Sequence, residues 1–499
     1  MLFNSINFLI FFPIVLGFYY LIPLKVRYIW LLLASYFFYM CWNAKYALLL
    51  LFSTGITYLS GVLMEYIENI QKCTSNQKLT YKKICVIGSF SLNIIVLAFF
   101  KYFDFLFVNV CRLLALFHVT VTIPEFDVLL PVGISFYTFQ ALSYTMDVYR
   151  REIYAEKNFF RYALFVSFFP QLVAGPIERS KNLLKQLATP QRFNFNHFRE
   201  GILLMIWGYF QKVVLADRIT LLVDTIYENY NTYGGFYLIA ATFLFAIQIY
   251  CDFGGYSTIA MGAAKILNID LIDNFNVPYF SQSVSEFWRR WHISLSSWFR
   301  DYLYIPLGGN RKGQFQKYLN LMIVFLISGL WHGAQWSYVF WGGLNGAYQV
   351  IGSITKPFRD KTVSVFKLNR NSFSHKALNV FTTFILIDFS WIFFRANRFI
   401  DAFQIIKSMF TVHNPWILFD GSLYKCGLNQ KNFSLMIWSI LLLILADFCK
   451  YRGINIRQFI LKQEYWFRSL IVAGSITLIL LFGIWGTGYN ESGFIYFQF

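Results

Sequence analysis

Long apolar stretches recur along the whole chain, with short polar loops between them. A helix needs about 20 predominantly apolar residues to cross a hydrocarbon core of ~30 Å. Four stretches with few charges come close to this length: 84–108, 378–394, 433–449 and 470–485. Only 14% of the 499 residues are charged, against about 25% in an ordinary soluble chain. The pattern therefore predicts an all-α, multi-pass (polytopic) membrane protein.

Lysine and arginine concentrate in particular loops, and this assigns the loops to sides because cytoplasmic loops of membrane proteins carry most of the positive charge. The loops at 65–83, 150–161 and 355–377 are strongly basic and should be cytoplasmic. The first apolar segment has no Lys or Arg before it and is followed by Lys25 and Arg27, so we expect its N-terminus outside. Threading the chain in this way gives eleven to thirteen transmembrane helices, among them 201–216 and 235–250.

Two further stretches predict more complex paths through the membrane. Residues 162–176 are short, contain Pro170 and are flanked by basic loops on both sides, which indicates a re-entrant segment with its irregular backbone buried in protein. Residues 318–354 lie between two basic loops and must therefore enter the membrane and return. The glycines at 342–346 indicate close helix packing, because no Lys-Ser/Thr follows them as it would in a phosphate-binding loop.

The net charge of +18 would indicate a nucleic-acid-binding surface in a soluble protein. Here the basic residues are spread over short loops, as the positive-inside rule requires, so we expect the lipid bilayer as a partner and no nucleic acid. The seven cysteines lack C-x-x-C spacing, and no third histidine or carboxylate stands at ligand spacing from His292 and His332, so no metal site is predicted.

His332 lies within the apolar segment 318–354, thirteen residues beyond Leu319. At 1.5 Å per residue this distance is ~20 Å along a helix, which is past the middle of the bilayer. An ionisable side chain at that depth is costly and indicates a function, and a neutral imidazole is well suited to removing a proton from a hydroxyl. The alternative interpretation is an imidazole bonded to a backbone carbonyl where Gly329 and Gly333 loosen the helix.

His292 belongs to the segment 283–300, SVSEFWRRWHISLSSWFR. Its first residues have the spacing of a capping box, and one helix face then collects Trp288, Trp291, His292, Leu295 and Phe299. The arginines point away from this face. The pattern predicts an amphipathic helix at the cytoplasmic interface, with tryptophans among the headgroups and arginines reaching phosphates. A hydrogen-bonded histidine under a tryptophan lid is an equally good interpretation of His292.

At these residues the chain resembles the membrane-bound O-acyltransferase family, in particular its bacterial branch similar to alginate O-acetyltransferases. The resemblance covers nearly the whole chain and rests on five strings: FPQLVAGPIER (169–179), QIYCDFGGYSTIAMG (248–262), NFNVPYFSQSVSEFWRRWHISLSSWFRDYLYIPLGGNR (274–311), SGLWHGAQWSYVFWG (328–342) and FIYFQF (494–499). Together these strings are highly specific, whereas LWHG alone would be a weak signal.

The resemblance implies an enzyme that moves an acyl group, usually acetyl, from a cytoplasmic thioester donor across the membrane for O-acetylation of an exported or cell-envelope polysaccharide. It implies a ring of helices around a thin central layer pierced by a tunnel. His332 corresponds to the family's invariant histidine and His292 to its second conserved one. The donor would be acetyl-CoA or an acylated carrier, with no bound cofactor. An extracytoplasmic acetyltransferase or acceptor protein would be a partner, and the location would be the bacterial cytoplasmic (inner) membrane.

Around the catalytic candidates His332 and His292 we expect a substrate-binding set: Trp288, Arg289, Arg290, Trp291, Arg300, Arg311, Asp252, Tyr256 and Trp331. The arginines are placed to meet donor phosphates, although Arg311 also fits the positive-inside rule alone. For Asp252 we favour a different role, as the cap of a helix that begins near Tyr256. Glu178 stands where members of the family more usually have an apolar or small residue.

Residues 1–499 are interpreted as a single integral membrane domain whose core motifs lie at about 130–350. Two alternative functions stay open. The first is D-alanyl transfer to teichoic acid, which relatives perform with the same fold. The ending FIYFQF argues against it and for the acetyl-transferring branch. The second is a transporter or lipid flippase that uses His332 as a proton relay. The absence of an internal sequence repeat counts against the second.

Overall fold

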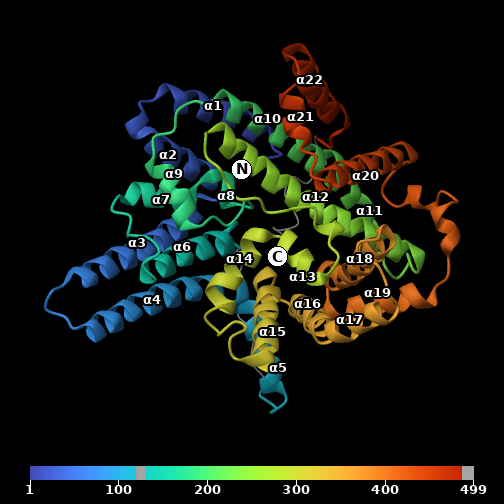
Figure 1. Cartoon of the computed structure of the whole chain (residues 1–499), viewed down its shortest axis with the longest axis horizontal. Helices are drawn as coiled ribbons and strands as arrows, with labels where there is room; N and C mark the ends of the chain where they lie inside the picture. The colour runs from blue at the N-terminus through green and yellow to red at the C-terminus, as the bar shows by residue number, and fades with distance from the viewer. Residues whose placement is uncertain (120, 122–129, 486–499) are drawn as a thin grey trace. The chain divides into compact units, whose positions relative to one another are not determined.

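The computed structural model describes residues 1–119, 121 and 130–485, and every regular element in these ranges is a helix (Figure 1). The all-α class is therefore confirmed. The chain divides into two compact units: unit 1 comprises Met1–Ile202 and Ala260–Ile272, and unit 2 comprises Leu203–Ile259 and the residues from Asp273 onward. The interpretation of a single domain stays a prediction, and the terminal FIYFQF lies outside the described residues.

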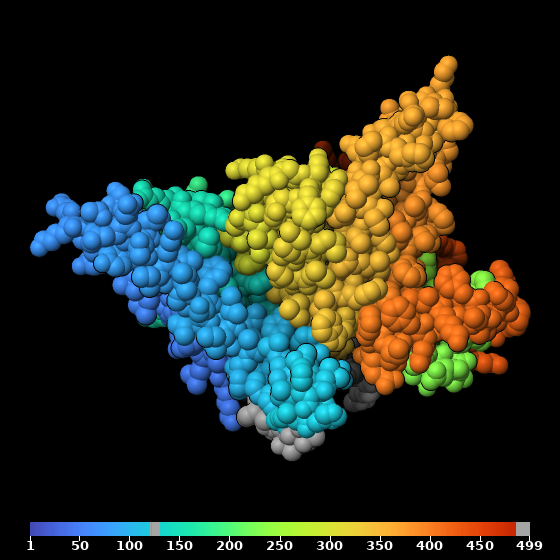
Figure 2. Space-filling model, turned by 90° about the horizontal axis from the view of Figure 1, so that it is seen from below, coloured from blue at the N-terminus to red at the C-terminus, as the bar shows by residue number. Residues whose placement is uncertain are grey.

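Unit 1 contains the helices of the N-terminal part: α1 (Ile6–Leu21), α2 (Arg27–Met40), α3 (Ala47–Asn69), α4 (Ser75–Leu97), α5 (Phe103–Ala115), α6 (Ile134–Tyr149), α7 (Phe159–Ser167), α8 (Phe169–Leu172) and α9 (Ser180–Ala188). Helices α3 and α4 lie side by side, as the blue pair in Figure 1 shows, and α6 packs against both. A π-helical segment, η3 (Ala98–Tyr102), joins α4 to α5. The joined element, light blue to cyan, runs across the face seen in Figure 2.

Unit 2 contains a π-helical segment, η4 (Phe210–Ala216), and the following helices: α11 (Asp217–Glu228), α13 (Val284–Arg290), α14 (Ile293–Phe299), α15 (Gly313–His332), α16 (Trp336–Ile354), α17 (Lys356–Val365), α18 (Phe373–Arg395), α19 (Phe399–Thr411), α20 (Gln430–Tyr451), α21 (Ile456–Leu461) and α22 (Tyr465–Phe482). Two long helices, α10 (Phe195–Tyr209) and α12 (Phe236–Ile266), contribute residues to both units.

Six helices in the described part of the chain are long and apolar enough to cross a membrane: Ala44–Asn69, Ser75–Ala115, Phe236–Ile266, Phe373–Arg395, Gln430–Tyr451 and Tyr465–Phe482. They include the four apolar stretches that the sequence singled out, so those helices are confirmed. Helix α1 is apolar but has only 16 residues. The protein is thus a multi-pass membrane protein, and the count of eleven to thirteen transmembrane helices stays a prediction.

Helix α12 runs without a break for 31 residues, whereas the sequence predicted a helix that ends at residue 250. The interpretation of Asp252 as a helix cap is therefore wrong, because this residue lies in the interior of α12. Its carboxylate accepts a hydrogen bond from Lys212 Nζ at 2.6 Å. A cation 40 positions away in sequence explains why a charged residue is tolerated inside an apolar helix.

The predicted re-entrant segment forms the short helices α7 and α8, which are separated by a break at Phe168. Every residue from 162 to 180 is buried. The carbonyl that the break frees, at Phe165, accepts hydrogen bonds from Gln140 Nε2 at 2.6 Å and Gln171 Nε2 at 2.8 Å. The expectation that the irregular backbone is buried in protein is confirmed, and side-chain amides replace the missing helical bonds.

Glu178 joins two parts of unit 1 that are distant in sequence. Its side chain accepts hydrogen bonds from the backbone N–H of Ile272 at 2.5 Å and from Asn182 Nδ2 at 3.0 Å. Burial, partly offset by these bonds, raises the pKa of Glu178 to about 7. The carboxyl group of Glu178 therefore links α9 to the loop after α12.

Helices α15 and α16 form the predicted hairpin, and small residues allow their backbones to approach closely. A Cβ added at Gly342 would lie 2.2 Å from the carbonyl oxygen of Phe325, and one added at Gly329 would lie 2.2 Å from that of Tyr338. Real Cβ atoms do not approach backbone atoms so closely. The prediction that the glycines at 342–346 serve close packing is therefore confirmed.

We expect Gly342→Ala to lower the free energy of unfolding by about 1–3 kcal/mol, because the added methyl group must push α15 and α16 apart. Gly352→Ala is the matched control on the same helix, since a Cβ there meets nothing within 4 Å. This control should be neutral or stabilise the helix by up to about 1 kcal/mol. Unfolding in detergent measures both variants, and equal stabilities would contradict the packing role.

Candidate active site

His332 is the last residue of α15, and its ring is enclosed by aromatic side chains of unit 2. The imidazole centroid lies 5.0 Å from that of Trp331, 5.1 Å from that of Trp341 and 5.5 Å from that of Phe394. The rings of Trp341 and His332 are almost perpendicular, at 89°. Only 4% of His332 is exposed. The buried position predicted for this histidine is confirmed, and three helices (α15, α16 and α18) fix its ring.

His292 occupies a break between two short helices, α13 and α14, with a backbone φ of 44°. The prediction of one continuous amphipathic helix is therefore wrong. The apolar spacing continues through residue 292, but the left-handed backbone there changes the direction of the chain. Histidine is one of the few residues with a side chain that adopts this conformation with any frequency, and the strain persists only where neighbouring contacts hold it.

Asn274 anchors His292 from the preceding loop. Its Oδ1 atom lies 3.1 Å from Nδ1 of His292, and it accepts hydrogen bonds from Ser294 Oγ at 2.9 Å and from the backbone N–H of Ser294 at 3.3 Å. A backbone N–H only donates, so this Asn274 atom must be the oxygen. The Nδ1 atom of His292 therefore carries a proton and donates it, and Nε2 is the basic atom of the neutral ring.

Burial lowers the pKa of His292 to about 3, so the ring is neutral at physiological pH. His292 is 1% exposed, and the ring of Phe253 packs against it in a T-shape at 4.7 Å. A neutral, fixed imidazole of this kind accepts a hydrogen bond and orients a partner. It does not provide positive charge.

The two histidines, 40 positions apart in sequence, meet in unit 2. Their ring centroids are 6.4 Å apart and their planes are inclined by 60°. At this separation the rings do not hydrogen-bond to each other directly. Trp331 contacts both rings, at 6.2 Å from His292 and 5.0 Å from His332. The structure thus assembles the two predicted catalytic residues and one predicted binding residue in a single aromatic enclosure.

A buried cluster of charges stands beside this enclosure, on α12 and η4. Lys212 Nζ lies 2.6 Å from Asp252 Oδ1 and 2.8 Å from Asp217 Oδ1, and all three side chains are at least 96% buried. Asp252 directly precedes Phe253, the residue that packs on His292. Lys212 was not predicted as a site residue, although a lysine within the apolar run 201–216 is itself a signal of function in a membrane segment. Asn274 was not predicted as a site residue either, although it is the first residue of the string 274–311.

The remaining predicted binding residues fall into two groups. Trp288, Trp291 and Tyr256 are buried, and Trp288 donates a hydrogen bond to Asn345 Oδ1 at 3.3 Å. The prediction that the tryptophans lie among headgroups is therefore wrong, because they form part of the core of unit 2. The arginines are exposed or half-exposed: Arg289, Arg290, Arg300 and Arg311. Two of them form ion pairs, Arg290 with Glu286 at 2.7 Å and Arg300 with Asp301 at 2.8 Å.

The lowered pKa of His292 makes the stability of the protein depend on pH with a definite sign. In the unfolded chain His292 binds a proton below about pH 6.5, whereas in the folded protein it stays neutral down to about pH 3. The free energy of unfolding therefore decreases by up to about 1.4 kcal/mol for each pH unit below 6.5. We expect His292→Asn to remove this acid sensitivity, and asparagine tolerates the left-handed backbone.

Unfolding in detergent at pH 7, 6, 5 and 4 measures the effect. The stability of the wild type relative to His292→Asn should decrease steadily as pH falls below 6.5. The matched control is His413→Asn, which replaces an exposed histidine of unit 2. Parallel curves for the wild type and His292→Asn would show that His292 titrates normally.

The long apolar helices define an integral membrane protein, and its two buried histidines form a candidate site for acid–base chemistry. Residues 19–394 match the membrane-bound O-acyltransferase family. The chain belongs to this family, and it is an O-acyltransferase. This result confirms the resemblance described from the sequence and sets aside the transporter alternative.

Three named relatives show which members of the family this chain is similar to. The chain is similar to the probable alginate O-acetylase AlgI of Pseudomonas aeruginosa, with 36% identity over 92% of this chain and 82% of the relative. It is similar to the peptidoglycan O-acetyltransferase of Helicobacter pylori, with 31% identity over 94% of this chain and 91% of the relative. A teichoic acid D-alanyltransferase of Streptococcus thermophilus is 28% identical over 53% of this chain and 68% of the relative.

Proposed function

We propose that this O-acyltransferase moves an acetyl group from a cytoplasmic thioester donor to hydroxyl groups of an exported or cell-envelope polysaccharide. The observation that carries the proposal is the pair of buried imidazoles, His332 and His292, in one aromatic enclosure. Relatives named for O-acetylation of alginate and of peptidoglycan match over more than nine-tenths of the chain. The D-alanyltransferase matches over only about half of it, which favours acetyl over D-alanyl.

In the proposed reaction His332 acts as general base. It takes the proton of the accepting hydroxyl while the oxygen attacks the thioester carbonyl carbon, and the C–S bond then breaks. The proton passes from the imidazolium to the departing thiolate, so the enzyme ends unchanged. His292 is neutral and is suited to orienting the donor through Nε2 rather than to moving a proton. The aromatic walls keep water from competing as the acceptor.

The donor would approach from the cytoplasmic side, to which the charge pattern assigns the basic loops. Arg289, Arg290, Arg300 and Arg311 are all exposed or half-exposed and suit the phosphates of acetyl-CoA or of a carrier's phosphopantetheine. The acyl end would reach His332 through the tunnel that the family resemblance implies. No bound cofactor is needed, because the donor itself supplies the activated acyl group.

The acceptor side completes the proposal. We place the protein in the bacterial cytoplasmic membrane, with the acetyl group leaving on the outer face. A partner there, either an extracytoplasmic acetyltransferase or an acceptor protein, would direct the acetyl group to the chosen polysaccharide. The names of the alginate and peptidoglycan relatives suggest glycan hydroxyls as the final acceptor.

The proposal is tested by deleting the coding sequence from its host and measuring ester-linked acetate released from surface polysaccharides by mild base. The deletion should lower ester acetate, and the wild-type chain should restore it while the His332→Gln variant does not. If the ester acetate is unchanged but D-alanyl esters disappear, the proposed acyl group is wrong. If no ester changes, the proposed polysaccharide acceptor is wrong.

A further inference from the structure

Unit 1 contains a hollow of about 210 Å³, away from the two histidines in sequence and belonging to no step of the proposed reaction. It lies where the turn between α1 and α2 meets the start of α7 and the loop after α9. Three cations line it (Lys25, Arg27 and Arg161), and none of its lining residues is acidic. Glu156, which is not a lining residue, forms an ion pair with Arg161 at 3.1 Å, so the excess positive charge of the hollow comes from Lys25 and Arg27.

Arg27 is held in place by neutral groups. Its guanidinium donates to the carbonyl oxygens of Ile22 at 3.0 Å, Tyr20 at 3.0 Å and Gln191 at 2.6 Å. Within the described ranges no carboxylate forms an ion pair with Arg27 or with the exposed Lys25. The carbonyls fix the geometry of the guanidinium and leave its charge uncompensated, which is the arrangement of an anion site.

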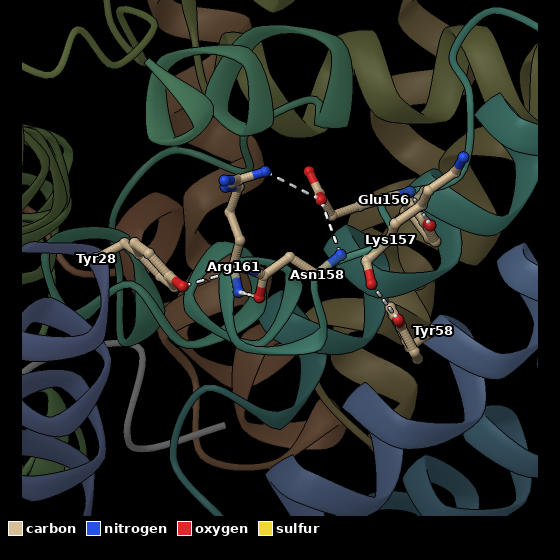
Figure 3. A network of polar contacts seen from close by, with 7 residues as sticks. Tyr28, Tyr58, Glu156, Lys157, Asn158 and Arg161 are labelled. Atoms are coloured by element: carbon tan, nitrogen blue, oxygen red, sulfur yellow. Dashed lines mark hydrogen bonds and ion pairs between the residues drawn. The ribbon is translucent and has the colours of Figure 1, made fainter. Parts of the chain in front are cut away.

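Arg161 is positioned by the network that Figure 3 shows. Its guanidinium donates to Glu156 at 3.1 Å and lies 5.6 Å from the ring centre of Tyr28. Asn158 caps the start of α7 by accepting from the backbone N–H of Arg161, and it donates to the hydroxyl of Tyr28 at 3.1 Å. These contacts hold the lining residues Tyr28 and Arg161 in a fixed arrangement without a ligand, so the site is preorganised.

The surroundings of the hollow point to a lipid rather than to a small soluble anion. Helices α1 and α2, which meet at the hollow, carry exposed apolar residues on their outer surfaces: Ile10, Ile14, Phe18, Leu21, Ile29, Leu33 and Phe37. Apolar surface of this kind accommodates acyl chains. The three cations also belong to segments that the charge pattern assigns to the cytoplasmic side, where membrane leaflets contain anionic lipids.

We propose that this hollow binds the phosphate headgroup of an anionic phospholipid, with Lys25, Arg27 and Arg161 around the phosphate and the acyl chains along α1 and α2. The site is separate from the acyl-transfer chemistry and does not depend on the proposed function. Its role is to fasten unit 1 to one leaflet, at the end of the helices where the chain turns back.

Native mass spectrometry of the full chain in detergent tests the site, with titrations of phosphatidylglycerol and of phosphatidylcholine bearing the same acyl chains. Each cation near an anionic lipid is worth about fivefold in binding. The wild type should prefer phosphatidylglycerol by at least about tenfold. The double variant Lys25→Gln, Arg161→Gln should bind phosphatidylglycerol about 25-fold more weakly.

The matched control is the double variant Lys72→Gln, Lys83→Gln, which removes two exposed lysines of unit 1 on the same predicted side but outside the hollow. It should retain the wild-type preference. Lys25→Gln alone, at an exposed side chain, should weaken binding about fivefold and guards against misfolding of the double variant. Equal binding of the two lipids, or equal losses in the test and control variants, would overturn the proposal. So would stabilisation by soluble glycerol 1-phosphate without any preference for phosphatidylglycerol.

Discussion

Replacing His332 by glutamine should lower the rate of acyl transfer by at least about 100-fold, because a general base contributes 10²–10⁴-fold to such reactions. Glutamine has a similar size and retains polar atoms, so the aromatic enclosure of Trp331, Trp341 and Phe394 should persist. The measurement is transfer of labelled acetyl from donor to a soluble glycan by purified protein in detergent, with donor and acceptor mixed.

His413→Gln is the matched control for this loss, since His413 is an exposed histidine of the same unit. It should retain wild-type activity. Thermal unfolding of both variants shows whether the fold is intact. If a folded His332→Gln variant keeps activity within a few-fold of the wild type, His332 is not the general base.

Replacing Lys212 by methionine should lower the free energy of unfolding by about 3–5 kcal/mol, the usual result when one partner of a buried ion pair is removed. The substitution takes away the ammonium group that both Asp217 and Asp252 contact, at 2.8 Å and 2.6 Å. It should also disturb the packing of Phe253 on His292, because Phe253 follows Asp252 on α12. Activity should therefore decrease together with stability.

A double variant separates a specific ion pair from a general packing effect. Lys212→Met with Asp252→Asn should lose less stability than the sum of the single variants, because removing one partner is costly only while the other stays charged and buried. Lys425→Met, at an exposed lysine of unit 2, should change stability by no more than about 0.5 kcal/mol. Additive losses in the double variant would contradict the coupling of Lys212 to Asp252.

The sequence predicted the features of this protein that depend on local composition. The length of the apolar stretches identified the helices that can cross the membrane. The spacing of the glycines identified the close contact between α15 and α16. The short interrupted run at 162–176 correctly indicated irregular buried backbone. The depth of His332 in an apolar segment was enough to predict that it is buried. Each of these signals is contained within about 20 consecutive residues.

The features that the sequence did not predict depend on long-range contacts or on a single backbone angle. The apolar spacing of 288–299 fits one helix equally well with or without the left-handed residue His292, so periodicity cannot detect the break. Asp252 has the sequence context of a helix cap, and only the fold reveals Lys212 as its partner. Asn274 orients His292 from 18 positions away, and an asparagine in a polar loop gives no local sign of this role.

The central claim is that the enclosure around His332 transfers an acyl group between the two faces of the membrane. The most direct test uses proteoliposomes with labelled acetyl-CoA outside and a soluble oligosaccharide acceptor trapped inside. We expect labelled ester on the trapped acceptor with wild-type protein, and a loss of at least about 100-fold with His332→Gln. Equal labelling by the variant, or labelling only when donor and acceptor share one compartment, would contradict it.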